Sequence, residues 1–280
     1  MAKVLTKEEI THYKNKGYLY PLRLITAEKA QATRKKFEAL ESKLGGKFSG
    51  THRTKFYLRY RWALKLATTP KMLDIVEDLL GPNILLYHNT TWFKNPADHG
   101  YVTWHQDITY FGHEPANVLS VWIALTPSNQ ESGCMQVLPG THKEGPLPLT
   151  TPDLSKNNML PSGQLVQFDT SSVTPVSMPL EPGEASIHHA CTIHGSLPNH
   201  SNHRRMGITF CYHSPKLKQR GEQQTSALLV RGKDDWGHYK LEEPPETDDH
   251  PDAIARHEYA VSLYRGKEAE LGKKTVTRFD

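Results

Sequence analysis

Two residues that could bind a metal ion, His105 and Asp107, lie two positions apart in the stretch WHQDITYF. Alternate side chains of a β-strand project from the same face, so an imidazole and a carboxylate at this spacing would point toward one place. They would supply two of the three protein ligands of a non-haem iron site, which keeps coordination positions open for other molecules. The spacing alone does not decide between such a site and a polar pair in an ordinary strand.

The same pattern of histidine, any residue and an acid occurs at two other places in the chain. His250 and Asp252 stand where a helix is expected to begin, and the helix dipole stabilises an acid in a first turn. His142 and Glu144 lie in PGTHKEG, a turn bounded by proline and glycine, where both side chains would be solvated. Only the pair in WHQDITYF lies between expected strands and has aromatic neighbours.

The segment that precedes this pair, residues 1–82, predicts helices. Three helical patterns begin at Thr6, Thr26 and Thr69, which are suitable N-caps, and each pattern ends at a glycine. Pro70 would occupy the first position of the third helix, where its missing N–H costs nothing.

Residues 83–213 have a different character. Short runs rich in β-branched and aromatic residues alternate with turns, as in ILLYHNTTWF, VLSVWIALT, CMQVLPG, GQLVQF, EASIHH and MGITFCY. Many short strands without intervening helices favour an antiparallel barrel or a double-sheet jelly roll. Residues 146–163 predict a long loop, and loops of this length often cover active sites.

Residues 214–280 predict a polar extension and a last helix from Pro251, so we expect one domain over residues 1–280. The formal net charge of +4 is too small and too scattered to indicate nucleic-acid binding. No window is apolar enough for a membrane span, and the charged N-terminal stretch does not resemble a signal peptide. Three widely spaced cysteines indicate reduced thiols, so we expect a cytoplasmic protein. Nothing in the sequence indicates an oligomeric state.

A second motif lies in the distal half, where His194 is followed by Gly195 and Ser196, with Arg205 eleven residues after the histidine. The order and spacing of HQD, HGS and this arginine resemble the phytanoyl-CoA dioxygenase family of Fe(II)- and 2-oxoglutarate-dependent oxygenases. The resemblance covers nearly the whole chain and includes LTKEEITHYKNKGYLYP, LLGPNILLYHNTTWFKNP, SGCMQVLPGTHKEG and LVRGKDDWGHYKLEEPP. It implies a double-stranded β-helix, a cupin-like jelly roll, with flanking N-terminal and C-terminal helices.

The resemblance also implies roles for individual residues. His105, Asp107 and His194 would hold Fe(II) and form the catalytic centre, with positions left for 2-oxoglutarate and O2. Arg205 would bind the far carboxylate of 2-oxoglutarate, because a guanidinium can pair with a carboxylate through two hydrogen bonds. Further co-substrate contacts are expected from Ser196, Trp122 and Thr90.

A basic residue upstream also contacts the co-substrate in some family members, and either Lys55 or Arg53 could take this place. We expect Lys55 at the co-substrate and Arg53 near the substrate, together with Tyr110 and Gln106. His88 and Trp92 lie on an expected strand of alternating polarity and could line the cavity or be buried in the sheet, and for His88 we expect structural burial. Neighbouring His188, His189 and Cys191 do not match a closed zinc site with four ligands.

The implied reaction is hydroxylation of an unactivated C–H bond, with succinate and CO2 as co-products. Asp107 favours hydroxylation over halogenation, since related halogenases lack this carboxylate. The basic stretch RTKFYLRYR favours a small, polar, anionic substrate, and our specific hypothesis is 2-aminoethylphosphonate. Alternatives are a free amino acid derivative, an acyl substrate, or a jelly-roll binding module without catalytic activity.

Overall fold

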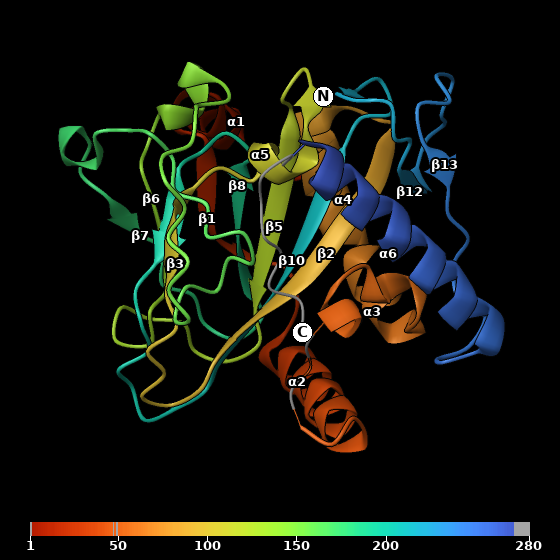
Figure 1. Cartoon of the computed structure of the whole chain (residues 1–280), viewed down its shortest axis with the longest axis horizontal. Coiled ribbons are helices and arrows are strands. Elements are labelled where there is room, and N and C mark those ends of the chain that lie inside the picture. The colour runs from red at the N-terminus through yellow and green to blue at the C-terminus, as the bar shows by residue number, and fades with distance from the viewer. Residues whose placement is uncertain (1, 47, 49, 272–280) are drawn as a thin grey trace.

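The structure, a computed structural model, describes residues 2–46, 48 and 50–271 and contains two main β-sheets (Figure 1). The larger sheet is built from β1 (Tyr18–Arg23), β2 (Ile84–Lys94), β5 (Val118–Ala124), β8 (Glu184–His189), β10 (Arg205–His213), β12 (Ser226–Arg231) and β13 (Lys240–Leu241). The smaller sheet is built from β3 (Val102–His105), β6 (Met135–Val137), β7 (Val176–Ser177) and β9 (His194–Ser196). A separate pair joins β4 (His113–Glu114) to β11 (Lys218–Gln219).

The strand order is β1-β8-β5-β10-β2-β12-β13 in the larger sheet and β3-β9-β6-β7 in the smaller one. All of these pairs are antiparallel except β12 with β13. Side chains from both sheets line one cavity between them. The predicted double-stranded β-helix is confirmed.

Helices pack around the larger sheet (Figure 1). They are α1 (Lys7–Lys16), α2 (Ala27–Lys43), α3 (Arg61–Ala67), α4 (Pro70–Leu80), the short α5 (Ile108–Phe111) and α6 (Pro251–Leu271). Short 3-10 turns span Gly50–Arg53, Phe56–Leu58, Thr141–Glu144 and Thr170–Ser172. The three helices predicted at the N-terminus and the last helix from Pro251 are present.

The ends of these helices follow local rules. Thr6 and Glu9 form a capping box that satisfies two N–H groups at the start of α1. Gly17 ends the same helix with a left-handed φ of 82°, a conformation that glycine adopts without a steric penalty. Pro70 occupies the first turn of α4, as expected.

Strand β10 shows how alternation divides core from cavity. Its side chains at 206, 208, 210 and 212 pack in the main hydrophobic core with residues of the N-terminal helices. The alternate side chains Arg205, Thr209 and Cys211 line the cavity. At the same cavity face, a Cβ on Gly207 would lie 1.9 Å from the ring of Trp122, so only glycine leaves room for this tryptophan.

Three predictions about the elements were wrong. The helical segment 1–82 also contains β1, which pairs with β8 at the edge of the larger sheet. The β core extends past residue 213, because β12 pairs with β2. GQLVQF is not a strand, since only Val166 forms an isolated bridge, with Leu149.

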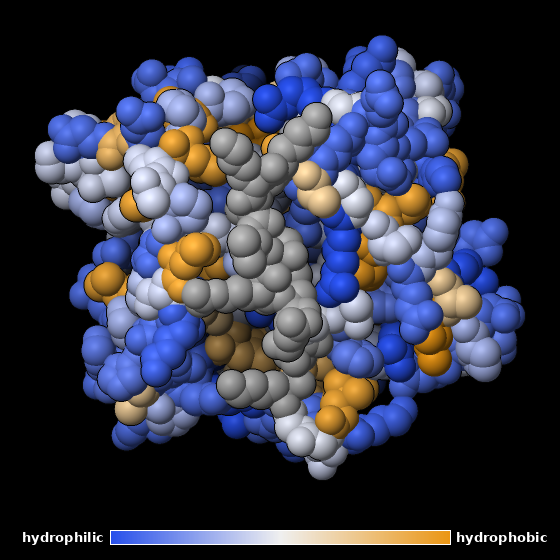
Figure 2. Space-filling view, in the orientation of Figure 1, coloured by the Kyte–Doolittle hydropathy of each residue, from blue (hydrophilic) through white to orange (hydrophobic). Residues whose placement is uncertain are grey.

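Most of the surface shown in Figure 2 is hydrophilic, and the hydrophobic residues there form separate patches. None of the helices among the described residues is long and apolar enough to cross a membrane. The cytoplasmic location stays a prediction.

Candidate active site

The two predicted motifs meet because β3 and β9 are neighbouring antiparallel strands in which His105 pairs with His194. The sequence pattern placed Asp107 on the same strand as His105, but β3 ends at His105. Asp107 has helical backbone angles and precedes α5, and its carboxylate still turns back toward the two imidazoles. Its Oδ1 lies 3.6 Å from Nε2 of His105 and 3.7 Å from Nε2 of His194. The three ligand atoms lie within 4.8 Å of one another, as binding of one metal ion requires.

Both histidines are held in the orientation that a metal ligand needs. Nδ1 of His105 lies 2.9 Å from the carbonyl oxygen of Thr103, and Nδ1 of His194 lies 2.9 Å from that of Thr192. A carbonyl oxygen only accepts, so each ring carries its proton on Nδ1 and presents an unprotonated Nε2. Burial, together with the nearby His105, holds the pKa of His194 well below its usual range. This arrangement fits a divalent iron ion.

Asp107 is fixed through its second oxygen. The hydroxyl of Ser120 donates to Oδ2 at 2.6 Å, and Nε2 of His188 lies 3.2 Å from the same atom. Burial alone would raise the pKa of Asp107, but the surrounding imidazoles of His194, His105 and His188 keep it well below its usual range. The carboxylate is therefore ionised and offers one oxygen to the metal position.

A positively charged end of the same cavity lies beside this triad. Arg205 is buried, and within residues 2–46, 48 and 50–271 no carboxylate lies within 4.0 Å of its guanidinium. Its Nε has no hydrogen-bond partner, and its Cζ lies 5.4 Å from the ring centre of Trp122. Burial lowers its pKa to about 10, so it stays charged at neutral pH. A buried charge without a partner is costly, which indicates that an anion binds here.

Ser196 lies at the same end and lines the cavity. Its hydroxyl accepts a hydrogen bond of 2.8 Å from Nζ of Lys94, which also donates to the carbonyl of Leu197. Lys94 is opposite Arg205 in the pairing of β2 with β10. Because Oγ already accepts from Lys94, its own proton is available to an anion in the cavity.

The other predicted residues divide into two groups. Thr90, Tyr110 and Arg53 line the cavity, as Trp122 does. The hydroxyl of Tyr110 is 3.2 Å from that of Ser162, in the loop predicted to be a lid. That loop also contributes Leu160 and Pro161 to the wall, and its role as a lid stays a prediction.

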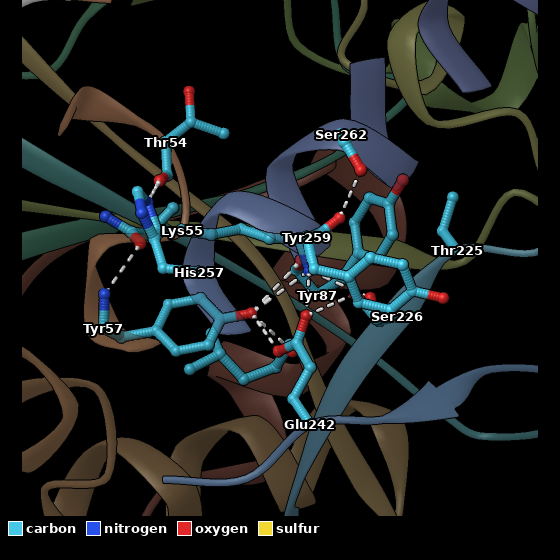
Figure 3. A network of polar contacts seen from close by, with 12 residues as sticks. Thr54, Lys55, Tyr57, Tyr87, Thr225, Ser226, Glu242, His257, Tyr259 and Ser262 are labelled. Atoms are coloured by element: carbon cyan, nitrogen blue, oxygen red, sulfur yellow. Dashed lines mark hydrogen bonds and ion pairs between the residues drawn. The ribbon is translucent and has the colours of Figure 1, made fainter. Parts of the chain in front are cut away.

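The structure does not place Lys55 at the cavity. Figure 3 shows its side chain directed toward Glu242, with Nζ 2.6 Å from Oε1 in a fully buried ion pair. Lys55 lies between two 3-10 turns and has a left-handed φ of 49°. Of the two basic candidates, only Arg53 reaches the cavity.

Gln106 is also outside the cavity. Its amide donates to the carbonyl oxygens of Gly145 and Cys191 at 3.0 and 2.7 Å and accepts from the N–H of Leu147. Gln106 directly follows β3, and its side chain is directed toward these backbone groups and away from the cavity that His105 and Asp107 line. Gln106 thus tethers the following loop, and both of its amide N–H groups are used there.

Sequence reasoning missed residues that come from distant elements. Ser120 and His188 fix Asp107, and Lys94 supports Ser196. His88, expected to be structural, lines the cavity, as do Tyr264 and Glu268 of α6. Alternation along the strand had indicated that His88 and Trp92 could line the cavity, and both do, but no local signal identifies Glu268.

Comparisons with known proteins agree with this geometry. The profile of the phytanoyl-CoA dioxygenase (PhyH) family matches residues 13–207. The chain is 32% identical over 156 residues to "Probable phytanoyl-CoA dioxygenase" of Caenorhabditis elegans, which covers 53% of this chain and 49% of the relative. It is 30% identical over 155 residues to "Probable alpha-ketoglutarate-dependent hypophosphite dioxygenase" of Stutzerimonas stutzeri, with coverage of 52% and 51%. The matched region thus spans about half the length of these curated relatives.

Among solved structures, the non-heme monooxygenase ThoJ has a TM-score of 0.84 at 25% identity, over 94% of this chain and 98% of that one. The structure of CytC3 with Fe(II) and alpha-ketoglutarate shares the fold, with a TM-score of 0.62 at 22% identity over 85% and 92% of the two chains. Because the family profile covers most of its length, the chain belongs to the phytanoyl-CoA dioxygenase family, as its motifs predicted.

Proposed function

We propose that this protein is an Fe(II)- and 2-oxoglutarate-dependent dioxygenase that hydroxylates a C–H bond of a small, polar, anionic metabolite. The observation that carries the proposal is the combination of two features in one cavity. A triad of His105, Asp107 and His194 presents three ligand atoms, and the unpaired Arg205 lies beside it. A jelly-roll module that only binds a ligand would need neither the oriented triad nor this second anion site.

In this proposal the triad holds Fe(II) through two imidazole nitrogens and one carboxylate oxygen. Bound iron would supply the oxidation, in which one oxygen atom of O2 enters succinate and the other enters the substrate C–H bond, with loss of CO2. The hydrogen bonds from Ser120 and His188 would keep Asp107 on one side of the metal. The remaining positions would stay open to 2-oxoglutarate and O2.

The chain's own residues would position 2-oxoglutarate. Arg205 would pair with its far carboxylate, and Ser196 would donate its hydroxyl proton to the same group. Trp122 and Thr90 would form the walls beside it, since both face the cavity. A fixed guanidinium on a central strand would orient the keto acid toward the metal.

The substrate would lie on the other side of the triad, near Arg53 and Tyr110. Our specific hypothesis is conversion of 2-aminoethylphosphonate to 2-amino-1-hydroxyethylphosphonate. The cation of Arg53 suits a phosphonate, and the Stutzerimonas relative is named for a phosphorus oxyanion. A free amino acid derivative is the second candidate, and an acyl substrate the third.

The reaction class is tested with purified protein, Fe(II), ascorbate, 2-oxoglutarate and a panel of phosphonates, amino acids and small acids. We expect succinate to accumulate and one panel member to gain the mass of one oxygen atom. Succinate at the background level with every panel member would contradict the proposal.

The metal ligands are tested with Asp107→Ala, which removes one of the three ligand groups. We expect loss of hydroxylation by a factor of about 1,000 or more, because binding of iron and its open geometry both depend on this carboxylate. Circular dichroism and thermal unfolding would establish that the variant still folds. Full activity of Asp107→Ala would remove Asp107 from the metal site.

A further inference from the structure

The C-terminal helix supplies an acid to the cavity. Tyr264 and Glu268, one helical turn apart on α6, both line it. Tyr264 stacks on His88 of β2 with ring centres 4.5 Å apart, which holds this face of α6 against the cavity. The carboxyl group of Glu268 therefore belongs to the wall around the substrate position.

The surroundings of Glu268 within the described part of the chain are neutral at close range. Among the residues that the structure describes, no basic side chain lies within 4.0 Å of its carboxylate, and its hydrogen-bond partner is the neutral hydroxyl of Tyr264. Burial raises its pKa to about 7, although Tyr264 and the more distant Arg265 oppose this shift. A glutamine of the same shape would avoid this cost, so a purely structural role does not explain the acid.

A cation faces the same cavity from another element. Arg53 donates to the carbonyl oxygen of Thr91 at 2.7 Å, and its Cζ lies 5.5 Å from the ring centre of Trp92. Neither contact neutralises its charge. His88 is neutral, because burial and the nearby Lys55 lower its pKa to about 3. Among the described residues that line this cavity, the arginine and carboxylate side chains other than Asp107 and Arg205 are thus Arg53 and Glu268.

We propose that Glu268 is a specificity-determining residue that binds the protonated amino group of the substrate, while Arg53 binds its anionic group. The substrate would then be a compact zwitterion. This inference rests on the proposed function and narrows it, since it favours aminoalkyl phosphonates and amino acids over acyl substrates. An ammonium group would supply the partner that Glu268 lacks and stabilise its ionised form.

The test compares probes that differ only in the amino group. The pairs are 2-aminoethylphosphonate with ethylphosphonate, and β-alanine with propionate. Binding to protein loaded with Fe(II) and 2-oxoglutarate is measured without O2 by isothermal titration calorimetry, and succinate formation is measured separately in air. The variants are Glu268→Gln, which keeps the shape of the side chain, and Glu258→Gln, an equal charge change at an exposed position of α6.

We expect the wild type and Glu258→Gln to bind at least one amino probe about 10- to 100-fold more tightly than its partner, and Glu268→Gln to lose this preference. Equal binding of both members of each pair by the wild type would overturn the inference. An unchanged preference in Glu268→Gln would overturn it as well. Absence of succinate with every probe would instead contradict the proposed function, and the inference with it.

Discussion

Two buried lysines of this protein, Lys55 and Lys94, have opposite surroundings. Lys55 forms an ion pair of 2.6 Å with Glu242, whose carboxylate also accepts from the hydroxyls of Tyr57 and Ser226 (Figure 3). Lys94 donates only to neutral oxygens, the hydroxyl of Ser196 and a carbonyl, and a second cation, Arg205, lies nearby. Lys55 thus has a counter-charge within the described part of the protein, and Lys94 does not.

This difference separates a structural network from a ligand site. Burying the charge of Lys55 costs free energy because the charge loses its water. A carboxylate and a complete set of hydrogen bonds around Lys55 compensate for this cost. At Lys94 and Arg205 this compensation is incomplete. Burial, together with repulsion from the positive charge of Arg205, lowers the pKa of Lys94 to about 6. An anion in the cavity would complete it. The basic residue with a buried carboxylate partner is therefore structural, and the pair without one indicates where a carboxylate binds.

The largest effect is expected from Glu242→Gln, which leaves Lys55 buried without its counter-charge. We expect a loss of about 3–5 kcal/mol in the free energy of unfolding, the usual cost of removing one partner from a buried pair. Chemical denaturation measures this change. The KM for 2-oxoglutarate of the folded fraction should stay as in the wild type. A raised KM with unchanged stability would reverse our assignment of this network.

Arg205→Met should act in the opposite way, on co-substrate binding and not on folding. We expect kcat/KM for 2-oxoglutarate to fall about 100-fold, because a charge-assisted bidentate contact is lost. The matched control is Arg204→Met. Arg204 is next in sequence, but it pairs with Glu41 through hydrogen bonds of 2.6 and 2.7 Å. Equal losses of kcat/KM in the two variants would argue against Arg205 as the carboxylate anchor.

Whether a residue's partners lie near it or far from it in the sequence explains how much of the site could be predicted. HQD, HGS and Arg205 follow one another at fixed spacings, and strand pairing brings them together, so the triad and the arginine could be placed from motifs. Lys55 could not be separated from Arg53, since both are basic and lie in a segment of short 3-10 turns that has no regular alternation. Its partner Glu242 lies 187 residues away, and no local pattern links the two.

The fold was predictable for a similar reason. Alternating β-branched runs and helix caps are local signals, and they gave β2, β5, β10 and the four main N-terminal and C-terminal helices. Strand β1 was missed because it follows Gly17 directly and becomes a strand through pairing with β8. Glu268 was missed as well, because its role depends on how α6 docks against the cavity.

A smaller effect is expected from Lys94→Met. Lys94 contacts the cavity only through Ser196, so it would position that hydroxyl and add a long-range positive charge. We expect the KM for 2-oxoglutarate to rise about 10-fold while kcat changes little. The free energy of unfolding should stay the same or increase, because a buried amine without a carboxylate partner is replaced by an apolar side chain. A stability loss as large as that of Glu242→Gln would make Lys94 a structural residue like Lys55.

The smallest effect is a pH dependence that follows from the same lysine. With a pKa of about 6, Lys94 is largely neutral at pH 7.5 in the absence of an anion. A bound carboxylate favours the protonated form, so binding of 2-oxoglutarate should take up a proton, and its affinity should fall as pH rises above 6. The buffer releases the proton that is taken up, so the observed binding enthalpy includes the ionisation enthalpy of the buffer. Calorimetric titrations at pH 7.5 in phosphate and in Tris, which have different ionisation enthalpies, would therefore give different observed enthalpies. Lys94→Met should remove this difference. If the variant retained it, the proton would belong to another group, and the contrast between the paired Lys55 and the unpaired Lys94 would lose its link to co-substrate binding.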